Sequence, residues 1–520
     1  MTDREKKMRK KHTRRIKSKR LWAAASIITA VVLCFSSAGA EIENAGTYLR
    51  KNVVTRTLSN GITLIMLNRG YAPTLAFEIS FSVGSSDEEY RTIGTAHLLE
   101  HMLFKGTDRL GTTDYEKEKV ILDEIEAVGE TIDRLRLSSP DNTMIPGLEK
   151  RLRLLQEKHR AYVVSSPYDR IYTGNGGVGF NASTSRDKTG YYIELPASKL
   201  ELWARTESER LRNPVLREFY LERNNVLEER LMRYDSSASG RLFEQFLAAA
   251  YSAHPYRHPI IGWKSNIPYL SIKDVRKFYR DHYIPSRMTI TIVGKQDTEK
   301  TYKTIEQYFG KIRSRPDPPR TAIDEPEQPG EKRIIVNFPA NPSMIIGWHK
   351  PSYPARADYV FDVIQELLAG GRSSRLYRSL VVEKKLASSV SAWNGAPGAR
   401  YNNMFVVLAS PQSPHSAREV EEAVYSEIES MIRQVSGQEL QKVINSMESD
   451  LIFSLASSSG LASLLSYYQT VFGDWRYAAE YMEAIKSVTP EEIKKEAEKY
   501  LTPKNRVVAI LKDSRREETK

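Results

Sequence analysis

The amino-acid sequence predicts an α+β fold made of two related α/β-sandwich halves, and three observations indicate it. Within each half, strand-like runs precede helix-like runs instead of alternating with them. Two similar segments, residues 271–285 and 489–503, each begin with Ser or Thr, continue as a charged amphipathic helix and end at a proline. Residues 311–332 contain five prolines and many charges and lie between the two halves, as an interdomain linker would.

The repeated segments read SIKDVRKFYRDHYIP and TPEEIKKEAEKYLTP, and the β-rich runs after them are RMTITIVG and NRVVAILK. Both halves therefore end in the same predicted helix-turn-strand unit, which indicates an internal duplication. The alternative is that a capped helix, a proline and a strand recur by coincidence. If the halves are duplicated, we expect an N-terminal domain over residues 41–310 and a C-terminal domain over residues 333–520.

The first half begins with strand signals and is then interrupted. Residues 61–69 and 74–84 predict two strands paired with each other, and residues 179–196 predict a hairpin ahead of helices that start near residue 198. Residues 117–172 predict an inserted antiparallel helical hairpin, because apolar residues recur at spacings of three and four on both sides of SSPDNT. The seam, expected to be the hairpin's own core rather than a partner site, consists of Ile121, Ile125, Val128, Ile132, Leu135, Ile145, Leu148, Leu152 and Leu155.

Residues 1–40 predict a secretory signal peptide. The first 20 residues carry eleven Lys and Arg against two acids, a 17-residue uncharged run follows, and an Ala-Gly-Ala cleavage site precedes Glu41. The run is short for a membrane span, although an uncleaved anchor is the alternative. Leu33 disfavours a lipid anchor on Cys34. We therefore expect export, most simply to a bacterial periplasm, with no stable membrane span after cleavage.

Removing this leader changes what the composition indicates. The leader carries +9 of the formal net charge of +12, so residues 41–520 carry only +3, and nucleic-acid binding loses its main support. The single cysteine of the chain also lies in the leader. The exported chain would therefore form no disulfide and no cysteine-ligated zinc site.

The stretch GTAHLLEHMLFKG, residues 94–106, contains a candidate metal site. His97 and His101 are four residues apart on a predicted helix, and Glu100 shares their face. Two imidazoles one helical turn apart can reach one ion, and a carboxylate beside it can act as a base. Catalytic zinc usually takes three protein ligands, so a third donor must come from elsewhere.

Carboxylates in the helix predicted over residues 214–235 are candidates for that donor. Glu222 and Glu229 are seven residues apart and share one face, whereas Glu228 points away. By itself this pattern is weak, because acidic helix faces are usually only solvated.

The motif HxxEH is the signature of the inverzincins, and the chain resembles the pitrilysin/insulinase family of zinc metallopeptidases, close to the bacterial relatives of mitochondrial processing peptidase. Matching segments follow the family's order over residues 53–295, and a looser match continues to the C-terminus. The segments are GTAHLLEHMLFKG, FNASTSRDKTGYY, LERNNVLEERLMRYD, HPYRHPIIGW and YIPSRMTITIVG. The third ligand lies farther along the chain than the family pattern expects, and the hairpin insertion accounts for the excess.

The resemblance implies a role for each candidate residue. The implied ligands of a single Zn²⁺ are His97, His101 and Glu229. Glu100 would be the general base, and Glu222 would be a supporting carboxylate behind the ligands. Asn181 would contact the backbone of a peptide substrate from an edge strand, in the manner of β-augmentation.

One part of the family pattern is missing. Relatives supply an arginine and a tyrosine from the C-terminal half or from a partner subunit, but LVVEKKLASSV has Val381 and Ser388 at those positions. Arg400 and Tyr401 lie nearby at a different register. The resemblance therefore favours a heterodimer in which a related subunit supplies the Arg/Tyr pair, with a homodimer as the alternative.

Two classes of function remain. The first is a zinc metalloendopeptidase that hydrolyses peptides or unstructured polypeptide segments. The second is a non-catalytic peptide-binding or assembly subunit of an exported complex. Members of the family that have lost catalysis usually lose HxxEH, and its presence here favours the enzyme.

Overall fold

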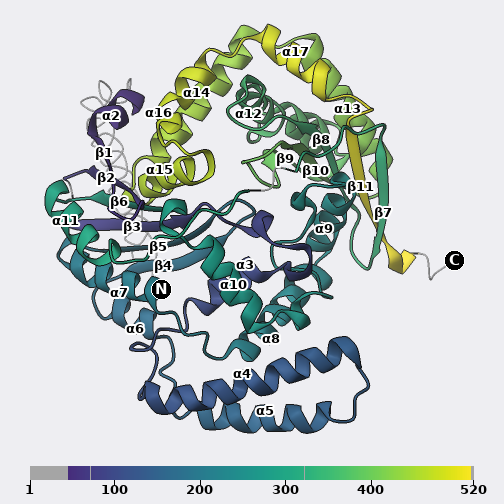
Figure 1. Ribbon diagram of the computed structural model, residues 1–520. Coiled ribbons are helices and arrows are strands. Elements are labelled where there is room, and N and C mark those ends of the chain that lie inside the picture. The colour runs from purple at the N-terminus through teal and green to yellow at the C-terminus, as the bar shows by residue number, and fades with distance from the viewer. Residues whose placement is uncertain (1–44, 71, 321–322, 517–520) are drawn as a thin grey trace, which may run out of the picture. The chain divides into compact units, whose positions relative to one another are not determined.

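The computed structural model describes residues 45–70, 72–320 and 323–516 (Figure 1). The predicted signal peptide and Cys34 lie outside these residues. The chain divides into two compact units, residues 1–52 and 53–520. Helix α2 (Ala45–Asn52) is the described part of the first unit, and all other described elements belong to the second.

The first sheet has six strands in the order β1-β2-β6-β3-β5-β4. These are β1 (Val53–Thr57), β2 (Thr63–Asn68), β3 (Thr74–Phe81), β4 (Val178–Thr184), β5 (Thr189–Pro196) and β6 (Met288–Gly294). β2 and β6 run parallel, and the other neighbouring strands are antiparallel. The predicted pairing of residues 61–69 with 74–84 is wrong, because β6 lies between β2 and β3. Every residue of β6 is buried, which favours a central place for this strand over one at an edge.

The second sheet repeats this arrangement, with strands in the order β7-β11-β8-β10-β9. These are β7 (Lys332–Phe338), β8 (Ser343–Lys350), β9 (Ala387–Ala396), β10 (Asn403–Pro411) and β11 (Arg506–Asp513). The parallel pair here is formed by β7 and β11, as it is by β2 and β6 in the first sheet. In chain order, β2 to β6 therefore correspond one by one to β7 to β11, and only β1 lacks a counterpart. This correspondence confirms the α+β class and the two related halves.

Helices cover the sheets in a reciprocal way (Figure 1). Those of the first half are α3 (Thr95–Met102), α4 (Tyr115–Ser138), α5 (Ile145–His159), α6 (Pro167–Thr173), α7 (Leu200–Arg212), α8 (Phe219–Arg230), α9 (Ala238–Ala250), α10 (Ile272–His282) and α11 (Thr298–Phe309). Those of the second half are α12 (Arg356–Ala369), α13 (Ala417–Arg433), α14 (Gly437–Ser454), α15 (Ser458–Phe472), α16 (Arg476–Lys486) and α17 (Pro490–Tyr500). α9 packs on β7, β8 and β11 of the second sheet, whereas α15 packs on β3 and β6 of the first. Each half thus supplies a helix that covers the other half's sheet.

The predicted repeat corresponds to α10 with β6 and to α17 with β11. Both helices begin with a capping box, Ser271 with Asp274 and Thr489 with Glu492, in which the cap side chain and the acid satisfy each other's backbone N–H groups. Residues 313–320 and 323–329 between the halves form neither helix nor strand. The predicted domain boundaries remain predictions.

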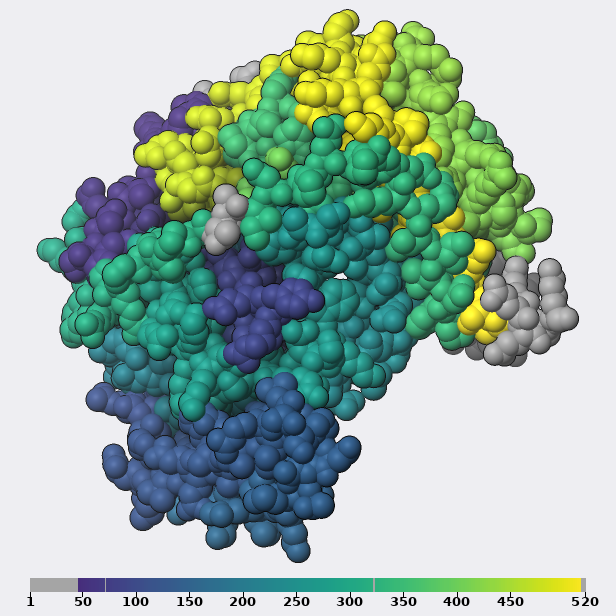
Figure 2. Space-filling view, turned by 45° about the vertical axis from the view of Figure 1, so that its right-hand side comes forward, coloured from purple at the N-terminus to yellow at the C-terminus, as the bar shows by residue number. Residues whose placement is uncertain are grey.

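Helices α4 and α5 form the predicted helical hairpin, which occupies the lower, blue part of Figure 2. Its seam is not a separate core, because four of its residues, Ile125, Val128, Ile132 and Leu155, belong to the main hydrophobic cluster of the first half. A buried ion pair joins the hairpin to α8, where Arg223 contacts Asp133 at 2.9 Å. The hairpin therefore braces α8, the helix that carries the candidate third ligand.

Among the described residues, no single helix is long and apolar enough to cross a membrane. α14 and α15 meet that criterion only as a pair, bent by 110° at the break between them.

Candidate metal centre

Helix α3, which carries HxxEH, is fixed at its N-terminus by a partly buried carboxylate. Glu88 accepts hydrogen bonds from the backbone N–H groups of Gly94 (2.9 Å) and Ala96 (2.7 Å). Burial raises the pKa of Glu88 to about 8, against the opposing effect of these two hydrogen bonds. Gly94 has φ +103°, and a Cβ there would lie 2.8 Å from the carbonyl oxygen of Ile261, so only glycine allows this approach. Sequence reasoning missed Glu88, although an acid just ahead of a helix is a recognisable signal.

The three predicted ligands meet between α3 and α8. His97 and His101 stand one turn apart on α3, with ring centroids 4.7 Å apart. The Oε2 atom of Glu229, on α8, lies 3.8 Å from Nε2 of His97 and 3.6 Å from Nε2 of His101. One donor atom from each residue falls within a group whose members are all within 4.8 Å of one another. Glu228, the neighbouring acid, is exposed.

Glu222 lies directly behind His101. Its Oε2 atom is 3.4 Å from Nδ1 of His101, which leaves Nε2 of the ring directed at Glu229. The other oxygen of Glu222 contacts the Lys105 ammonium at 2.6 Å, and Lys105 also binds Glu218 at 3.0 Å. A carboxylate on the far nitrogen of a ligating imidazole fixes the ring orientation and the tautomer. The structure thus brings Glu222 to the place that the resemblance implies.

Glu100 shares the face of α3 with the two histidines and is held by the first sheet. Thr184, the last residue of β4, donates a hydrogen bond to Oε2 of Glu100. β4 is an edge strand, with β5 on one side and no other strand beside it in the described chain. Asn181 is exposed on β4, where its side chain accepts a hydrogen bond from Ala182 N–H. An open strand edge therefore lies next to the candidate base, as β-augmentation requires.

The local environment gives these groups different proton affinities. Burial, together with the charges of His101 and Arg233, lowers the pKa of His97 to about 3, so its imidazole is neutral and able to bind a metal. Burial also raises the pKa of Glu100, and the hydrogen bond from Thr184 only partly opposes this. For Glu222, burial is outweighed by hydrogen bonds to His101 and Lys105, which lower its pKa to about 2. For His101, burial is outweighed by the surrounding carboxylates, which raise its pKa.

The donor set fits zinc. Two imidazole nitrogens and one carboxylate oxygen are typical of catalytic zinc sites, which leave a fourth position open. Ligand atoms about 2.0–2.1 Å from a tetrahedral ion lie roughly 3.3–3.5 Å apart, close to the 3.6 and 3.8 Å found between Glu229 and the two imidazoles.

The positions at which the resemblance implies an arginine and a tyrosine hold Val381 and Ser388. Val381 packs against the core of the second half, and the exposed Ser388 donates its hydroxyl to the carbonyl of Ser410. Arg400 is engaged elsewhere, because its guanidinium binds Ser82 Oγ at 2.9 Å and the carbonyl of Asp187.

Comparison with known proteins agrees with this geometry. The profile described as insulinase (peptidase family M16) matches residues 64–144 and 170–264, and that of the peptidase M16 inactive domain matches residues 269–447. Together they cover more than half of the chain. The chain belongs to peptidase family M16. The unmatched residues 145–169, which include α5, fall within the predicted insertion, whereas α4 lies inside a matched segment.

Proteins similar to this family member are named as zinc proteases. The zinc protease PqqE of Helicobacter pylori is 24% identical over 477 residues, which make up 90% of this chain and 94% of that protein. The crystal structure of a protease from Helicobacter pylori is similar with a TM-score of 0.75 and 24% identity, and the match covers 88% of this chain and 99% of that one. The periplasmic protease PqqL from Escherichia coli has a TM-score of 0.65 at 16% identity, and the match covers 90% of this chain and 48% of that one. These structures share the two-domain fold.

Proposed function

We propose that this M16 family member is a zinc-dependent endopeptidase that hydrolyses peptides or unstructured polypeptide segments. The observation that carries the proposal is the convergence of His97, His101 and Glu229 beside Glu100. The zinc ion held by the three ligands would polarise the scissile carbonyl and lower the pKa of a water molecule. Because its pKa is raised, Glu100 is well suited to take the proton from the attacking water and to deliver it to the leaving amine.

The surrounding residues support this chemistry without taking part in proton transfer. Thr184 orients the Glu100 carboxylate, and Glu222 orients His101. The free edge of β4 next to α3 is suited to an extended peptide, which would add to the sheet as a further strand, with Asn181 beside its backbone. Folded proteins cannot offer such a strand readily, which is why we propose unstructured substrates.

The test is cleavage of quenched fluorescent peptides by residues 41–520 loaded with zinc, in parallel with Glu100→Gln. We expect the substitution to reduce turnover by about 10²–10⁴-fold, the usual contribution of a positioned base, while the zinc content stays unchanged. Equal turnover by the two proteins would disprove the assigned role. Zinc binding without any cleavage would indicate either a missing partner subunit or the alternative, a non-catalytic peptide-binding subunit of an exported complex. Activity restored by adding a related chain would identify the first, and no activity with such a chain would identify the second.

We further propose that a related subunit completes the active site in a heterodimer. Val381 has no hydrogen-bond donor in its side chain, the hydroxyl of Ser388 is too short to replace a tyrosine, and the Arg400 guanidinium is already bound to Ser82 and Asp187. The partner would supply an arginine and a tyrosine to the substrate carbonyl. Full activity of the isolated monomer would overturn this proposal, and activity confined to a homodimer would replace it.

We propose that the protein acts after export, in the periplasm of a bacterium. The basic and apolar leader with its Ala-Gly-Ala site supports this destination. Fractionation of cells that express the full chain, with N-terminal sequencing of the mature protein, tests it. An N-terminus at Glu41 in the periplasmic fraction is expected, and an intact leader in the membrane fraction would contradict it.

A further inference from the structure

A cavity of about 600 Å³ lies on the face of the second sheet, where α9 leaves β9 and β10 uncovered. Alternate residues of β9, Ser389, Ser391 and Trp393, line it, whereas Val390 and Ala392 between them pack into the core. The opposite wall is formed by the start of α9 and by the π-helical turn η4 (Leu231–Asp235), which continues directly from α8. The cavity therefore begins where the metal-binding helix ends.

The polar residues of the lining include a cation but no acid. Arg233 is the one charged residue among the described residues that line the cavity, and no acid accompanies it. The lining also contains apolar residues, such as Leu242, Phe243 and Trp393, and six serines from three strands and the start of α9: Ser237, Ser239, Ser343, Ser389, Ser391 and Ser410. A guanidinium and hydroxyl groups in one cavity can both donate hydrogen bonds to a carboxylate.

Arg233 connects this cavity to the metal centre. Its Nε atom lies 3.0 Å from Oε1 of Glu229, whereas the other oxygen of Glu229, Oε2, is the one directed at the two histidines. Among the described residues, Glu229 is the acid that pairs with Arg233, and 69% of the Arg233 side chain is exposed. The end of the guanidinium is therefore free for a further carboxylate one side chain away from the metal ligands.

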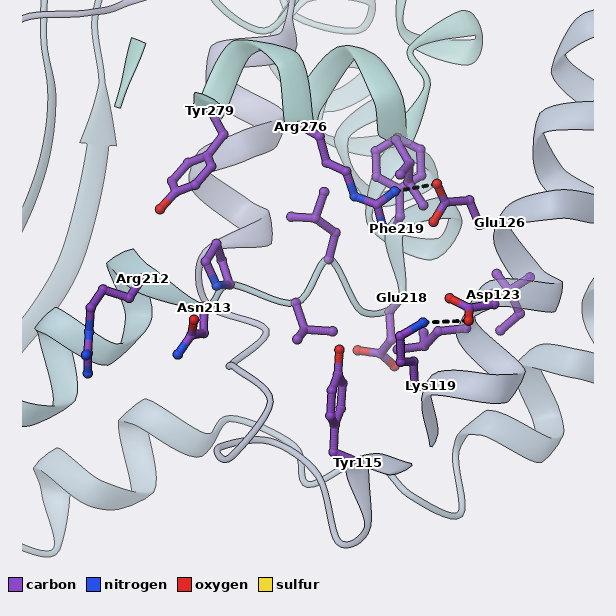
Figure 3. Close-up of a pocket in the computed structure, with 16 residues that line it drawn as sticks. Tyr115, Lys119, Asp123, Glu126, Arg212, Asn213, Glu218, Phe219, Arg276 and Tyr279 are labelled. Atoms are coloured by element: carbon purple, nitrogen blue, oxygen red, sulfur yellow. Dashed lines mark hydrogen bonds and ion pairs between the residues drawn. The ribbon is translucent and has the colours of Figure 1, made fainter. Parts of the chain in front are cut away.

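A second cavity has a lining in which each cation is paired with an acid (Figure 3). It has a volume of about 320 Å³ and lies between α4, the start of α8 and α10. There Lys119 is paired with Asp123 at 2.6 Å, and Arg276 is paired with Glu126. These two cations are thus neutralised by acids of the same lining, and the third, Arg212, is paired with Glu209 of its own helix at 2.9 Å. Only in the serine-lined cavity is the cation shared with a metal ligand.

We propose that the serine-lined cavity is a substrate subsite that selects an acidic side chain close to the scissile bond. This inference rests on the proposed peptidase function, because it assigns the occupant to the peptide bound at the metal centre. The Asp or Glu of the substrate would bind the terminal nitrogens of Arg233, with the hydroxyls of Ser389 and Ser391 donating to the same carboxylate. The C-terminal carboxylate of a peptide has the same chemistry and is the second possible source of the ligand.

Binding to the Glu100→Gln chain, loaded with zinc, tests the subsite apart from turnover. The probes are short fluorescent peptides of one sequence with a single Glu, Gln or Lys at each position in turn, amidated or free at the C-terminus. We expect one position at which Glu binds about tenfold more tightly than Gln, equivalent to about 1.4 kcal/mol, with the Lys peptide weaker still. A preference that depends only on a free C-terminus would assign the cavity to a terminal carboxylate instead. Equal binding of the Glu and Gln peptides at every position, or no binding of the Glu peptides, overturns the proposal.

Two matched pairs of variants locate the effect. Ser391→Asp places a carboxylate in the cavity without touching Arg233 and should abolish the Glu preference, whereas Ser388→Asp, on the opposite face of β9, should retain it. Arg233→Gln should also abolish the Glu preference. Arg241→Gln on α9 is its control and should retain the preference, and zinc content is measured for both variants. If Ser391→Asp and Ser388→Asp behave alike, the cavity is not the subsite. A wild-type chain that cleaves nothing, alone or with a related subunit, would refute the proposed function, whereas the binding test still decides whether the cavity prefers a carboxylate.

Discussion

Helices α3 and α12 occupy the same place in the two halves, each being the first α-helix after the central strands β3 and β8, yet their polar residues are used differently. On α3, His97 and His101 are four residues apart and face a carboxylate from another helix across a space suited to an ion. On α12, Asp358 and Asp362 have the same spacing. The second pair, however, is satisfied by protein groups.

The cluster around α12 is closed by contacts from three elements. Lys350 at the end of β8 has a fully buried side chain and pairs with Asp358. Asn394 on β9 donates to Asp362 at 2.8 Å, and Tyr481 on α16 donates to the other oxygen of Asp362 at 3.0 Å. β9 corresponds to β4, whose Thr184 donates to Glu100. One framework therefore supports a ligand site in the first half and a buried polar network in the second.

The largest expected difference between these sites is in metal content. His97→Ala removes one of three ligands, and we expect zinc to fall from one equivalent per chain to a trace, because the two remaining donors cannot hold the ion. Asp362→Asn, at the corresponding site of the second half, should keep the full equivalent. Metal analysis after gel filtration measures both. Zinc retained by His97→Ala, or lost from Asp362→Asn, would contradict the distinction.

In the second half, we expect a substitution in the polar network to lower the free energy of unfolding and to leave the zinc content unchanged. Lys350→Met removes a fully buried ammonium and leaves the partly buried Asp358 beside Asp362 without a cation. Losing one partner of a buried ion pair costs about 3–5 kcal/mol. We expect urea unfolding to shift by that amount while zinc content is unaffected. The control is Lys384→Met, because Lys384 is 46% exposed and pairs with Glu427 at the surface, where such pairs contribute about 0–1 kcal/mol. Similar shifts for both variants would argue against a buried network.

Substitution of Glu222, the carboxylate behind His101, should reduce zinc binding less than loss of a ligand does. Glu222→Gln weakens the hydrogen bond that orients His101, and loss of such a carboxylate typically lowers metal affinity about 10–100-fold. Competition with a fluorescent zinc chelator measures the change. Glu228→Gln, on the same helix but exposed, should leave the affinity at the wild-type value. An unchanged affinity in Glu222→Gln would remove this residue from the metal centre.

These contrasts also indicate what sequence can and cannot predict here. The spacing of His97, Glu100 and His101 placed them on one helical face, and the resemblance to the family indicated Glu229. The first signal is a short spacing in the sequence, and the second is a sequence motif of the family. The repeat of α10 and α17 was likewise visible, because capping boxes, prolines and the following strands are written in adjacent residues.

Contacts between segments that are distant in the sequence could not be predicted from it. Insertion of β6 between β2 and β3 depends on a strand more than 200 residues away, so adjacency in the sequence predicted the wrong pair. The hydrogen bonds from Thr184 to Glu100 and from Gly94 and Ala96 to Glu88 depend on tertiary placement. The serine-lined cavity could not be predicted for the same reason, because its residues come from three strands and a helix terminus and form no motif.

The smallest expected effect is on the pH dependence of the free energy of unfolding, which has opposite signs at the two sites. Burial raises the pKa of Asp362 to about 6, with the charge of Asp358 adding to the shift, against its ordinary value of 3.8. The folded chain therefore holds this proton more tightly than the unfolded chain, so the contribution of Asp362 to stability falls as pH rises from about 4 to 6. Glu222, with a pKa lowered to about 2, has the opposite sign and contributes stability above pH 4.5 that is lost as pH falls toward 2. Relative to Asp362→Asn, the wild type should lose about 1 kcal/mol between pH 4.5 and 5.5, as measured by urea unfolding. A gain over that interval would mean that Asp362 is ionised in the folded chain and that Lys350 serves both aspartates.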